Sequence, residues 1–454
     1  MSEQNPKKMS VTQLTLLTAI NMMGSGIVML PTKLAEIGTI SILSWVITAF
    51  GSLCLAYAFA KCGMFSKRPG MGGYAEYAFG KAGNFLANYT YGISLLFANI
   101  AIALTCVGYG SELLGISLSP IHVCLSTIVV LWLCTSANFM GASITGKFSS
   151  LAVWCVVLPV LLLSVIGWFW FNPTLYVESW NPHHHPFFSA VGASISMTLW
   201  AFLGLESACA NSDAVENPQK NVPIVVMAAT IGVAIIYIAS TNIIAGIVPN
   251  TELVASNAPF GLTFSLMFNS TVGKFVTFLL ILSCAGSTLG WQFTIAKVFQ
   301  QSAAEGFFPK CFAKVNRWGA PVLGMIIIVA IQTCFCFMTI SPELFNQFNR
   351  LVDLAVVTNI MPYLLSMAAV GVIMKAANVE PAKAKLYTFV ALIGALYSFY
   401  ALFSTGITEV FYGSLATFLG WTLWGLLATR FVSDKIKLSQ QIFKGLSARQ
   451  SFFI

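Results

Sequence analysis

One acidic residue, Glu206, lies inside an apolar stretch of the chain, in the segment Leu199–Ser207 (LWAFLGLES). A charged side chain near the centre of a bilayer costs about 2.5–3.5 kcal/mol on insertion scales. A charge that is kept despite this cost indicates a functional role. A carboxylate in apolar surroundings is suited to bind a cation. Trp200 and Gly204 flank Glu206, so we expect an aromatic face and a helix break beside the carboxylate.

A second indole with the same possible role is Trp291, which follows the small residues of Ser283–Gly290 (SCAGSTLG). An organic ammonium can pair with Glu206 and lie over indole faces, each such contact contributing about 0.5–2 kcal/mol. Many tryptophans in membrane proteins are instead interfacial anchors. That explanation fits Trp168, Trp170 and Trp180, which lie near the end of an apolar stretch.

The composition defines the setting in which these residues act. The chain has 454 residues, of which 57% are hydrophobic and 8% charged. Soluble domains carry about 25% charged residues, so the sequence predicts an all-α polytopic membrane protein with no room for a soluble domain. Since a span needs about 20 apolar residues, we expect about twelve spans. They are 11–37, 41–61, 84–112, 120–140, 148–171, 187–211, 222–247, 271–299, 322–340, 350–374, 386–404 and 410–431.

The net charge of +8 reflects topology rather than a nucleic-acid partner. With these spans, all of the 23 basic residues except Lys33, Lys274 and Arg350 fall on one side of the membrane. Basic residues concentrate on the cytoplasmic side of membrane proteins. Both termini are therefore predicted to be cytoplasmic, and the lipid bilayer is the expected macroscopic partner.

Two of the predicted spans contain helix-breaking glycines. The first span contains Asn21–Ile27 (NMMGSGI) before Pro31, and the sixth contains Gly204–Ser207 (GLES). The two interruptions lie five spans apart, as in an inverted repeat of five plus five helices. Broken helices at corresponding positions point to a transporter site near the membrane midplane. The alternative for Gly24 and Gly26 is that they only permit close helix packing.

Other polar motifs have simpler explanations. The segment Gly63–Gly83 reads as a cytoplasmic connection that could carry a small interfacial helix and a moving gate, and its glycines lack the Lys-Ser/Thr of a phosphate-binding loop. His183–His185 lie between two prolines, which favours an exposed turn over a metal site. Arg350 and Asp353 are spaced i,i+3 and are expected mainly to compensate each other, with an attraction of cations at the outer mouth left open for Asp353. No metal or cofactor is predicted.

Five stretches carry a resemblance to a known family: Asn21–Pro31 (NMMGSGIVMLP), Gly72–Gly80 (GGYAEYAFG), Leu199–Asn211 (LWAFLGLESACAN), Glu216–Pro223 (ENPQKNVP) and Gly290–Ala296 (GWQFTIA). On these the chain resembles the basic amino acid–polyamine antiporters of the amino acid–polyamine–organocation superfamily, and in particular its putrescine–ornithine branch. The resemblance implies a LeuT-like five-plus-five inverted repeat with helices 1 and 6 broken and two additional C-terminal helices, and often a homodimer.

The domain organisation that follows is a single transmembrane domain over 1–431. Its first repeat covers about 11–171 and its second about 187–374, with helices 11 and 12 over about 386–431 and a cytoplasmic tail over 432–454.

The resemblance also implies the roles of ten residues. Gly24, Ser25 and Gly26 would receive a substrate carboxylate. Trp200 would be an outer gate and Trp291 a middle gate. The remaining positions match an inner layer (Tyr91, Glu206 and Tyr363), a functional cysteine (Cys62) and a position where the family pattern has tyrosine and this chain has tryptophan (Trp424).

The expected activity is secondary transport across the bacterial inner membrane, not enzymatic chemistry. Putrescine would leave in exchange for ornithine, and proton-coupled putrescine uptake is left open as a second mode. The alternatives are a cadaverine–lysine or agmatine–arginine antiporter of the same fold, or, in another class, a cation channel. A channel would need polar residues along a continuous path, whereas the acids here are isolated in the sequence.

Overall fold

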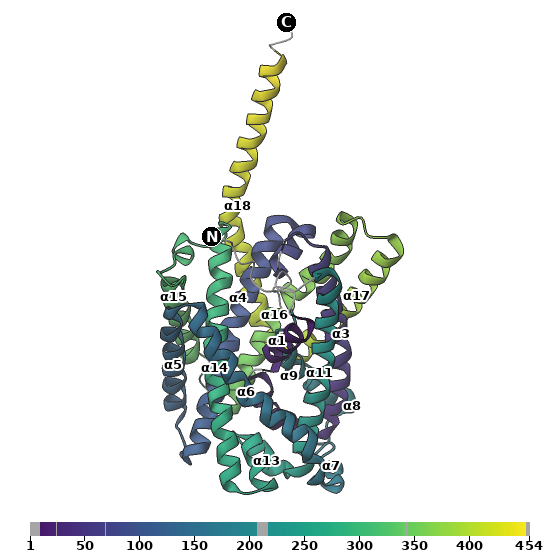
Figure 1. Cartoon of the computed structure of the whole chain (residues 1–454), viewed down its shortest axis with the longest axis vertical. Helices are drawn as coiled ribbons and strands as arrows, with labels where there is room; N and C mark the ends of the chain where they lie inside the picture. Colours follow the sequence, from purple (N-terminus) through teal and green to yellow (C-terminus); the bar gives the residue numbers. More distant parts are fainter. Residues whose placement is uncertain are drawn as a thin grey trace.

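The computed structural model describes residues 10–23, 25–68, 70–206, 217–338, 340 and 344–450. Within these ranges the chain forms helices and connecting segments and no strand, and the helices pack side by side into one bundle (Figure 1). Nine helices in the described part of the chain are long and apolar enough to cross a membrane. They are α3 (Ile42–Phe65), α4 (Gly70–Leu114), α5 (Pro120–Ala137), α6 (Ala142–Ile166), α11 (Pro218–Ile247), α14 (Ser270–Ala304), α16 (Leu344–Ala376), α17 (Pro381–Ser404) and α18 (Ile407–Gln450).

The first predicted span is divided as its glycines indicated. It consists of α1 (Val11–Met23), a 3₁₀ turn η1 (Ser25–Ile27) and α2 (Leu30–Ile37). Pro31 lies in the first turn of α2, where a missing N–H costs nothing. The break therefore places non-helical backbone in the middle of an apolar segment, which a membrane tolerates only where the backbone is buried in protein or lines a cavity.

The sixth predicted span is also divided. Its described part, residues 187–206, contains α8 (Phe187–Ala193) and α9 (Ile195–Phe202), after which Leu203 turns to an extended conformation with ψ 135°. Gly204 has φ 105°, a left-handed conformation that favours glycine. The chain thus leaves the helix after Phe202, and Glu206 lies in the turn that follows. The predicted breaks in the first and sixth spans are confirmed.

Short helices complete the bundle. At the end opposite to the protruding part of α18 lie α7 (Pro173–Glu178) and α13 (Pro259–Met267), as Figure 1 shows. The others are α12 (Asn250–Ala255), α15 (Val322–Met338) and the 3₁₀ turns η2 (Thr39–Ser41), η3 (Asn138–Met140), η4 (Gly167–Phe169) and η6 (Lys310–Ala313).

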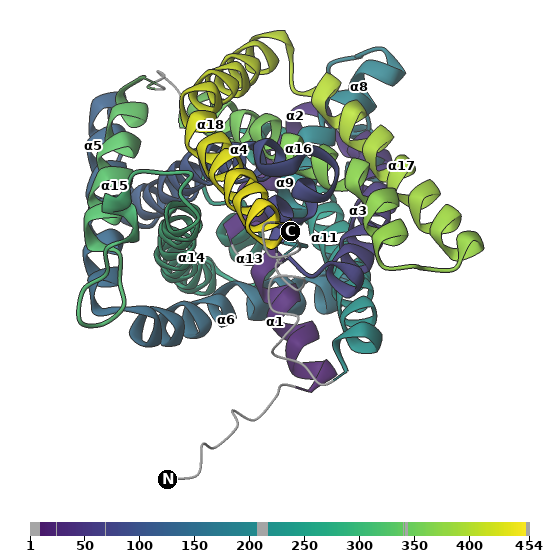
Figure 2. The ribbon, with the colours of Figure 1, turned by 90° about the horizontal axis from the view of Figure 1, so that it is seen from above.

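The centre of the bundle is formed by α4 and α16, which pack against each other more extensively than any other pair of described helices. Seen from above, α4, α9 and α16 lie near the middle, while α5, α15 and α17 lie toward the edge (Figure 2). Most of α4 is buried, whereas the apolar side chains on α17 and α18 are largely exposed, as expected for a surface in contact with lipid. The predicted all-α polytopic fold is confirmed, while the exact repeat boundaries stay a prediction.

The connection at Gly63–Gly83 contains the short helix that the sequence suggested. Its interfacial position and its movement as a gate stay predictions. This short helix is the first part of α4, residues 70–79, and the non-helical backbone of Gly80 (φ 62°, ψ −158°) separates it from the helix of the third span. Only glycine adopts this conformation readily, so Gly80 permits the sharp bend between the polar short helix and the buried span.

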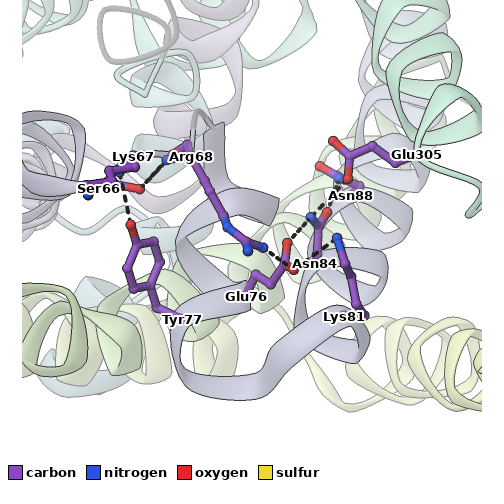
Figure 3. Close-up of polar contacts among 9 residues, drawn as sticks. All are labelled: Ser66, Lys67, Arg68, Glu76, Tyr77, Lys81, Asn84, Asn88 and Glu305. Atoms are coloured by element: carbon purple, nitrogen blue, oxygen red, sulfur yellow. Dashed lines mark hydrogen bonds and ion pairs between the residues drawn. The ribbon is translucent and has the colours of Figure 1, made fainter. Parts of the chain in front are cut away.

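An ionic network holds this bend (Figure 3). Glu76, before the bend, pairs with Arg68, and Lys81, after the bend, lies 3.0 Å from the same carboxylate. The Asn84 amide donates to Glu76 at 2.8 Å and to Glu305 at 3.2 Å. Because Glu305 follows the last residue of α14, the network also connects the bend of α4 to the end of α14.

Candidate functional site

The carboxylate of Glu206 is buried and hydrogen-bonded from three directions. The Tyr363 hydroxyl of α16 donates to Oε2 at 2.7 Å, and the Tyr91 hydroxyl of α4 donates to Oε1 at 3.1 Å. The Gly204 N–H, freed by the end of α9, donates to Oε2 at 3.1 Å. The two central helices and the broken helix therefore meet at this one side chain.

All three donors are neutral. Over the described residues, no lysine, arginine or histidine nitrogen forms an ion pair with Glu206; the ion pairs found there join Arg68 and Lys81 to Glu76, and Lys383 to Glu380. Burying a carboxylate without a cation is costly, and neutral hydrogen bonds compensate it only in part. The arrangement therefore favours the binding of a cation at Glu206.

A cavity lies beside the carboxylate. Its walls come from six elements: α1 and η1 of the first broken helix, the α9 end of the second, and α4, α14 and α16. Five of the residues implied by the family resemblance line it, namely Gly26, Tyr91, Trp200, Glu206 and Trp291. Non-helical backbone, a carboxylate and two indoles thus face one space, as a transporter site at broken helices requires.

The two indoles are differently buried. Trp200 on α9 is 5% exposed, and its Nε1 lies 3.8 Å from where a Cβ on Gly26 would be. Trp291 on α14 is partly buried against the core. Both rings border the cavity that contains the Glu206 carboxylate, so an ammonium on Glu206 can also be stabilised by an aromatic face.

The glycine segment of the first broken helix is only partly described. Gly24 lies outside the described residues, and of Ser25 the backbone is described, in η1. A methyl group on Gly26 would meet Ala201 Cα at 3.7 Å, an ordinary van der Waals distance. Gly26 is therefore not required by steric crowding with α9, and its effect is to leave space in the cavity wall.

Three of the remaining predicted residues do not line the cavity. Tyr363 contacts it only through its hydrogen bond to Glu206. Cys62 is buried near the end of α3, where its carbonyl accepts the Ser66 N–H at 2.8 Å. Trp424 on α18 packs against Phe85, with ring centroids 5.7 Å apart. The expected substrate contacts of Cys62 and Trp424 stay predictions.

Two polar residues that the sequence analysis did not select also line the cavity: Ser94 on α4 and Asn359 on α16. Asn359 precedes Tyr363 by four residues, so both lie on one face of the same helix. An asparagine inside an apolar span, one turn before a tyrosine with an expected role, was the signal that could have identified it.

The predicted pairing of Arg350 with Asp353 is wrong. No ion pair joins the two side chains, and Arg350 is exposed. Asp353 instead lies against Ser196 of α9, with Lys33 of α2 as the cation that influences it most. An i,i+3 spacing brings two residues to neighbouring positions on a helix, but the packing of α16 turns Asp353 inward and leaves Arg350 outside.

A bundle of membrane-spanning helices in which two broken helices bring backbone, a carboxylate and indoles to one central cavity defines a membrane permease. The model of the amino acid permease family matches residues 9–426. The chain belongs to this family.

Individual relatives agree with this assignment. The chain is 66% identical to "Putrescine transporter PotE" of Escherichia coli (strain K12) over 432 residues, which cover 95% of this chain and 98% of that protein. It is 64% identical to the protein of the same name from Haemophilus influenzae (strain ATCC 51907 / DSM 11121 / KW20 / Rd) over 425 residues, 93% and 98% of the two chains. It is 30% identical to the "Cadaverine/lysine antiporter" of Escherichia coli (strain K12) over 367 residues, 79% and 82% of the two chains.

Proposed function

We propose that this chain is a secondary transporter that exchanges putrescine for ornithine across the inner membrane, with both termini in the cytoplasm. The name of the 66% identical relative supports putrescine as a substrate. The observation that carries the proposal is the Glu206 carboxylate, which is buried beside a cavity and hydrogen-bonded by neutral groups. A diamine supplies the positive charge that these groups do not.

Both substrates fit one arrangement of groups. In each, an ammonium pairs with Glu206 while the methylenes lie along Trp200 and Trp291, whose rings border the same cavity. The carboxylate that ornithine has and putrescine lacks is received by backbone N–H groups around Gly24–Gly26, as free N–H groups at helix ends favour anions. Putrescine forgoes this contact and depends more heavily on Glu206.

The charges of the substrates set the energetics. Ornithine carries +1 inward and putrescine +2 outward, so one exchange moves one positive charge out. This step opposes an inside-negative potential by about 2.3 kcal/mol per 100 mV. The exchange therefore runs on concentration gradients, which intracellular decarboxylation of ornithine would maintain. In the uptake mode, a proton on Glu206 replaces the returning amine.

Alternating access follows from the two broken helices. One bundle rocks about the other, and Trp200 closes the cavity toward the outside while the layer of Tyr91, Glu206 and Tyr363 closes it toward the cytoplasm. The hydrogen bonds of both tyrosines to Glu206 support this inner layer. The homodimer that the family resemblance implies is part of the same proposal.

A cadaverine–lysine antiporter is the second candidate, because the chain is 30% identical to a protein of that name. The two diamines differ by one methylene, which a hydrophobic site distinguishes only by about 10–200-fold. Exchange measured with both diamines therefore decides between the candidates.

The test uses the full chain in proteoliposomes. Vesicles loaded with ornithine should take up labelled putrescine much faster than empty vesicles, and cadaverine and agmatine should compete more weakly than unlabelled putrescine. Uptake that does not depend on the internal substrate would contradict antiport and favour a channel. Preferential exchange of cadaverine for lysine would replace the proposed pair by the second candidate.

A further inference from the structure

Asn359 is a buried polar residue in the cavity wall, and its side-chain amide has no hydrogen-bond partner among the described residues. It lies on α16 with 2% of its surface exposed, and it lines the cavity beside Glu206. Its amide is close to the Tyr363 hydroxyl. However, neither the oxygen nor the nitrogen of that amide makes a hydrogen bond of acceptable distance and angle with any described residue. Buried amides in proteins are nearly always paired.

Such an amide opposes folding, since it loses its hydrogen bonds to water and gains none in return. A leucine of similar size would pack at this place without that cost. The asparagine at a cavity wall is therefore best explained by a ligand that completes its hydrogen bonds.

The hydrogen bonds around Glu206 indicate which part of the ligand this is. A carboxylate has about four acceptor positions. Tyr91, Tyr363 and the Gly204 N–H donate to the Glu206 carboxylate, and the backbone N–H of Glu206 itself also interacts with it. A primary ammonium has three N–H donors, so Glu206 leaves at most about one position for it. At least one further N–H needs another acceptor in the cavity.

The other polar groups of the cavity wall are less suitable. The hydroxyl oxygens of Ser94 and Tyr91 can still accept an N–H, but each hydroxyl already has a hydrogen-bond partner, the Ala355 carbonyl at 2.7 Å and the Glu206 carboxylate at 3.1 Å. The Trp200 indole nitrogen is a donor and cannot accept an N–H. The Asn359 amide oxygen is an uncommitted acceptor in the same wall.

We propose that the Asn359 amide oxygen accepts a second N–H of the ammonium bound to Glu206 and thereby selects primary amines over N-methylated ones. The proposal rests on the proposed function and specifies its substrate class. Methylation removes N–H donors while the positive charge remains. A tertiary ammonium keeps one N–H, which Glu206 takes, and Asn359 then stays without a partner.

The probe is N,N,N′,N′-tetramethylputrescine, in which both ends carry one N–H, so that reversing the molecule in the site does not restore a primary amine. Competition against labelled putrescine in proteoliposomes gives the ratio of the two apparent affinities. A hydrogen bond to a charged group corresponds to about a 10–100-fold difference in affinity. We expect wild type to prefer putrescine by at least that factor.

The deciding variant is Asn359→Leu, which keeps the volume of the side chain and removes its acceptor. We expect it to lose about 10-fold or more in putrescine affinity, while the affinity for tetramethylputrescine changes little. The ratio of the two affinities then falls to the part that is caused by the size of the methyl groups. It should unfold at the same or a higher temperature than wild type in detergent, because an unpaired amide has been removed. Thr358→Val is the matched control, since the Thr358 hydroxyl bonds within its own helix at 2.7 Å.

The outcomes are distinct. An unchanged preference in Asn359→Leu, with wild type binding putrescine, overturns the role of Asn359 and leaves the proposed function intact. A wild-type chain that does not bind putrescine overturns both. If Asn359→Leu does not fold, Asn359→Ala takes its place, and a loss of preference that appears equally in Thr358→Val counts against the proposal.

Discussion

Glu76 and Glu206 both have side chains with little exposure to solvent, at 8% each, but their surroundings are opposite. Glu76, at the bend of α4, pairs with Arg68 and Lys81 and also accepts from Asn84 (Figure 3). Glu206, at the end of α9, is held by two tyrosine hydroxyls and a backbone N–H. Cations of the chain itself neutralise the first charge, whereas none of the described ion pairs involves the second. We infer that Glu76 serves the architecture and Glu206 serves transport.

The positions of Glu76 and Glu206 in the fold agree with a structural role for the first and a transport role for the second. The Glu76 network joins residues on both sides of Gly80 and reaches Glu305 beyond α14 through Asn84, so it fixes how two helices meet. The Glu206 carboxylate instead faces a cavity whose walls come from six elements. A charge that is balanced inside the protein stabilises one arrangement, whereas an unbalanced one responds to what enters the cavity.

The largest effect should come from Glu206→Gln. This change keeps the shape and the tyrosine contacts but removes the negative charge that the ammonium needs. We expect putrescine–ornithine exchange to fall by at least about 100-fold, the equivalent of about 2.7 kcal/mol, with a thermal stability equal to or above that of wild type. Initial exchange rates in proteoliposomes measure this, and near-normal exchange in Glu206→Gln would remove the contrast between the two glutamates.

The indoles should matter less than the charge. Trp200→Leu and Trp291→Leu each remove one aromatic face, a contribution of about 0.5–2 kcal/mol or about 2–30-fold in substrate affinity. Phenylalanine at either position should restore part of the loss. Competition with unlabelled putrescine measures the affinities. Leucine and phenylalanine variants of equal affinity would show that the rings act only by their bulk.

Glu76→Gln should show the opposite pattern from Glu206→Gln. It leaves Arg68 and Lys81, about half-exposed at 49% and 45%, without their carboxylate, and we expect a loss of stability of about 1–2 kcal/mol. Putrescine affinity should stay within about 2-fold of wild type, because the network does not line the cavity. Thermal unfolding in detergent together with a binding titration tests both parts. A large loss of affinity without loss of stability would give Glu76 a role in transport.

The smallest effect is expected at the exposed pair of Lys383 with Glu380, which lie 2.9 Å apart. Exposed ion pairs are solvated and contribute little. Lys383→Met should change neither the unfolding temperature nor the exchange rate measurably. It is the matched control for Glu76→Gln, and a clear loss of stability here would show that removal of any ion pair destabilises this protein in detergent.

Sequence patterns predicted the features that depend on composition and local chemistry. The lengths of the apolar stretches predicted the spans, and glycines predicted the breaks in the first and sixth of them. Glu206 was identified because an acidic side chain inside the membrane costs free energy and is rarely kept without a function. These features follow from the chain itself, because a charge or a glycine in an apolar segment has few explanations.

Features that depend on how helices rotate against each other could not be predicted. The short helix before Gly80 was expected, but the Glu76 network that fixes its position was not, because that network includes Glu305, far away in the sequence. The inward orientation of Asp353 and the place of Asn359 in the cavity wall depend on the face that α16 presents to α4 and α9. Nothing in a single sequence specifies that rotation, so the side chains around Glu206 became known only from the packed helices.

The central claim is that the Glu206 charge is reserved for the substrate amine. The most direct measurement is calorimetric titration of putrescine into the detergent-purified full chain, as wild type, Glu206→Gln and Glu76→Gln. The account predicts that Glu76→Gln binds nearly as wild type does, while Glu206→Gln loses at least about 100-fold in affinity. Binding that survives in Glu206→Gln and disappears in Glu76→Gln would contradict it.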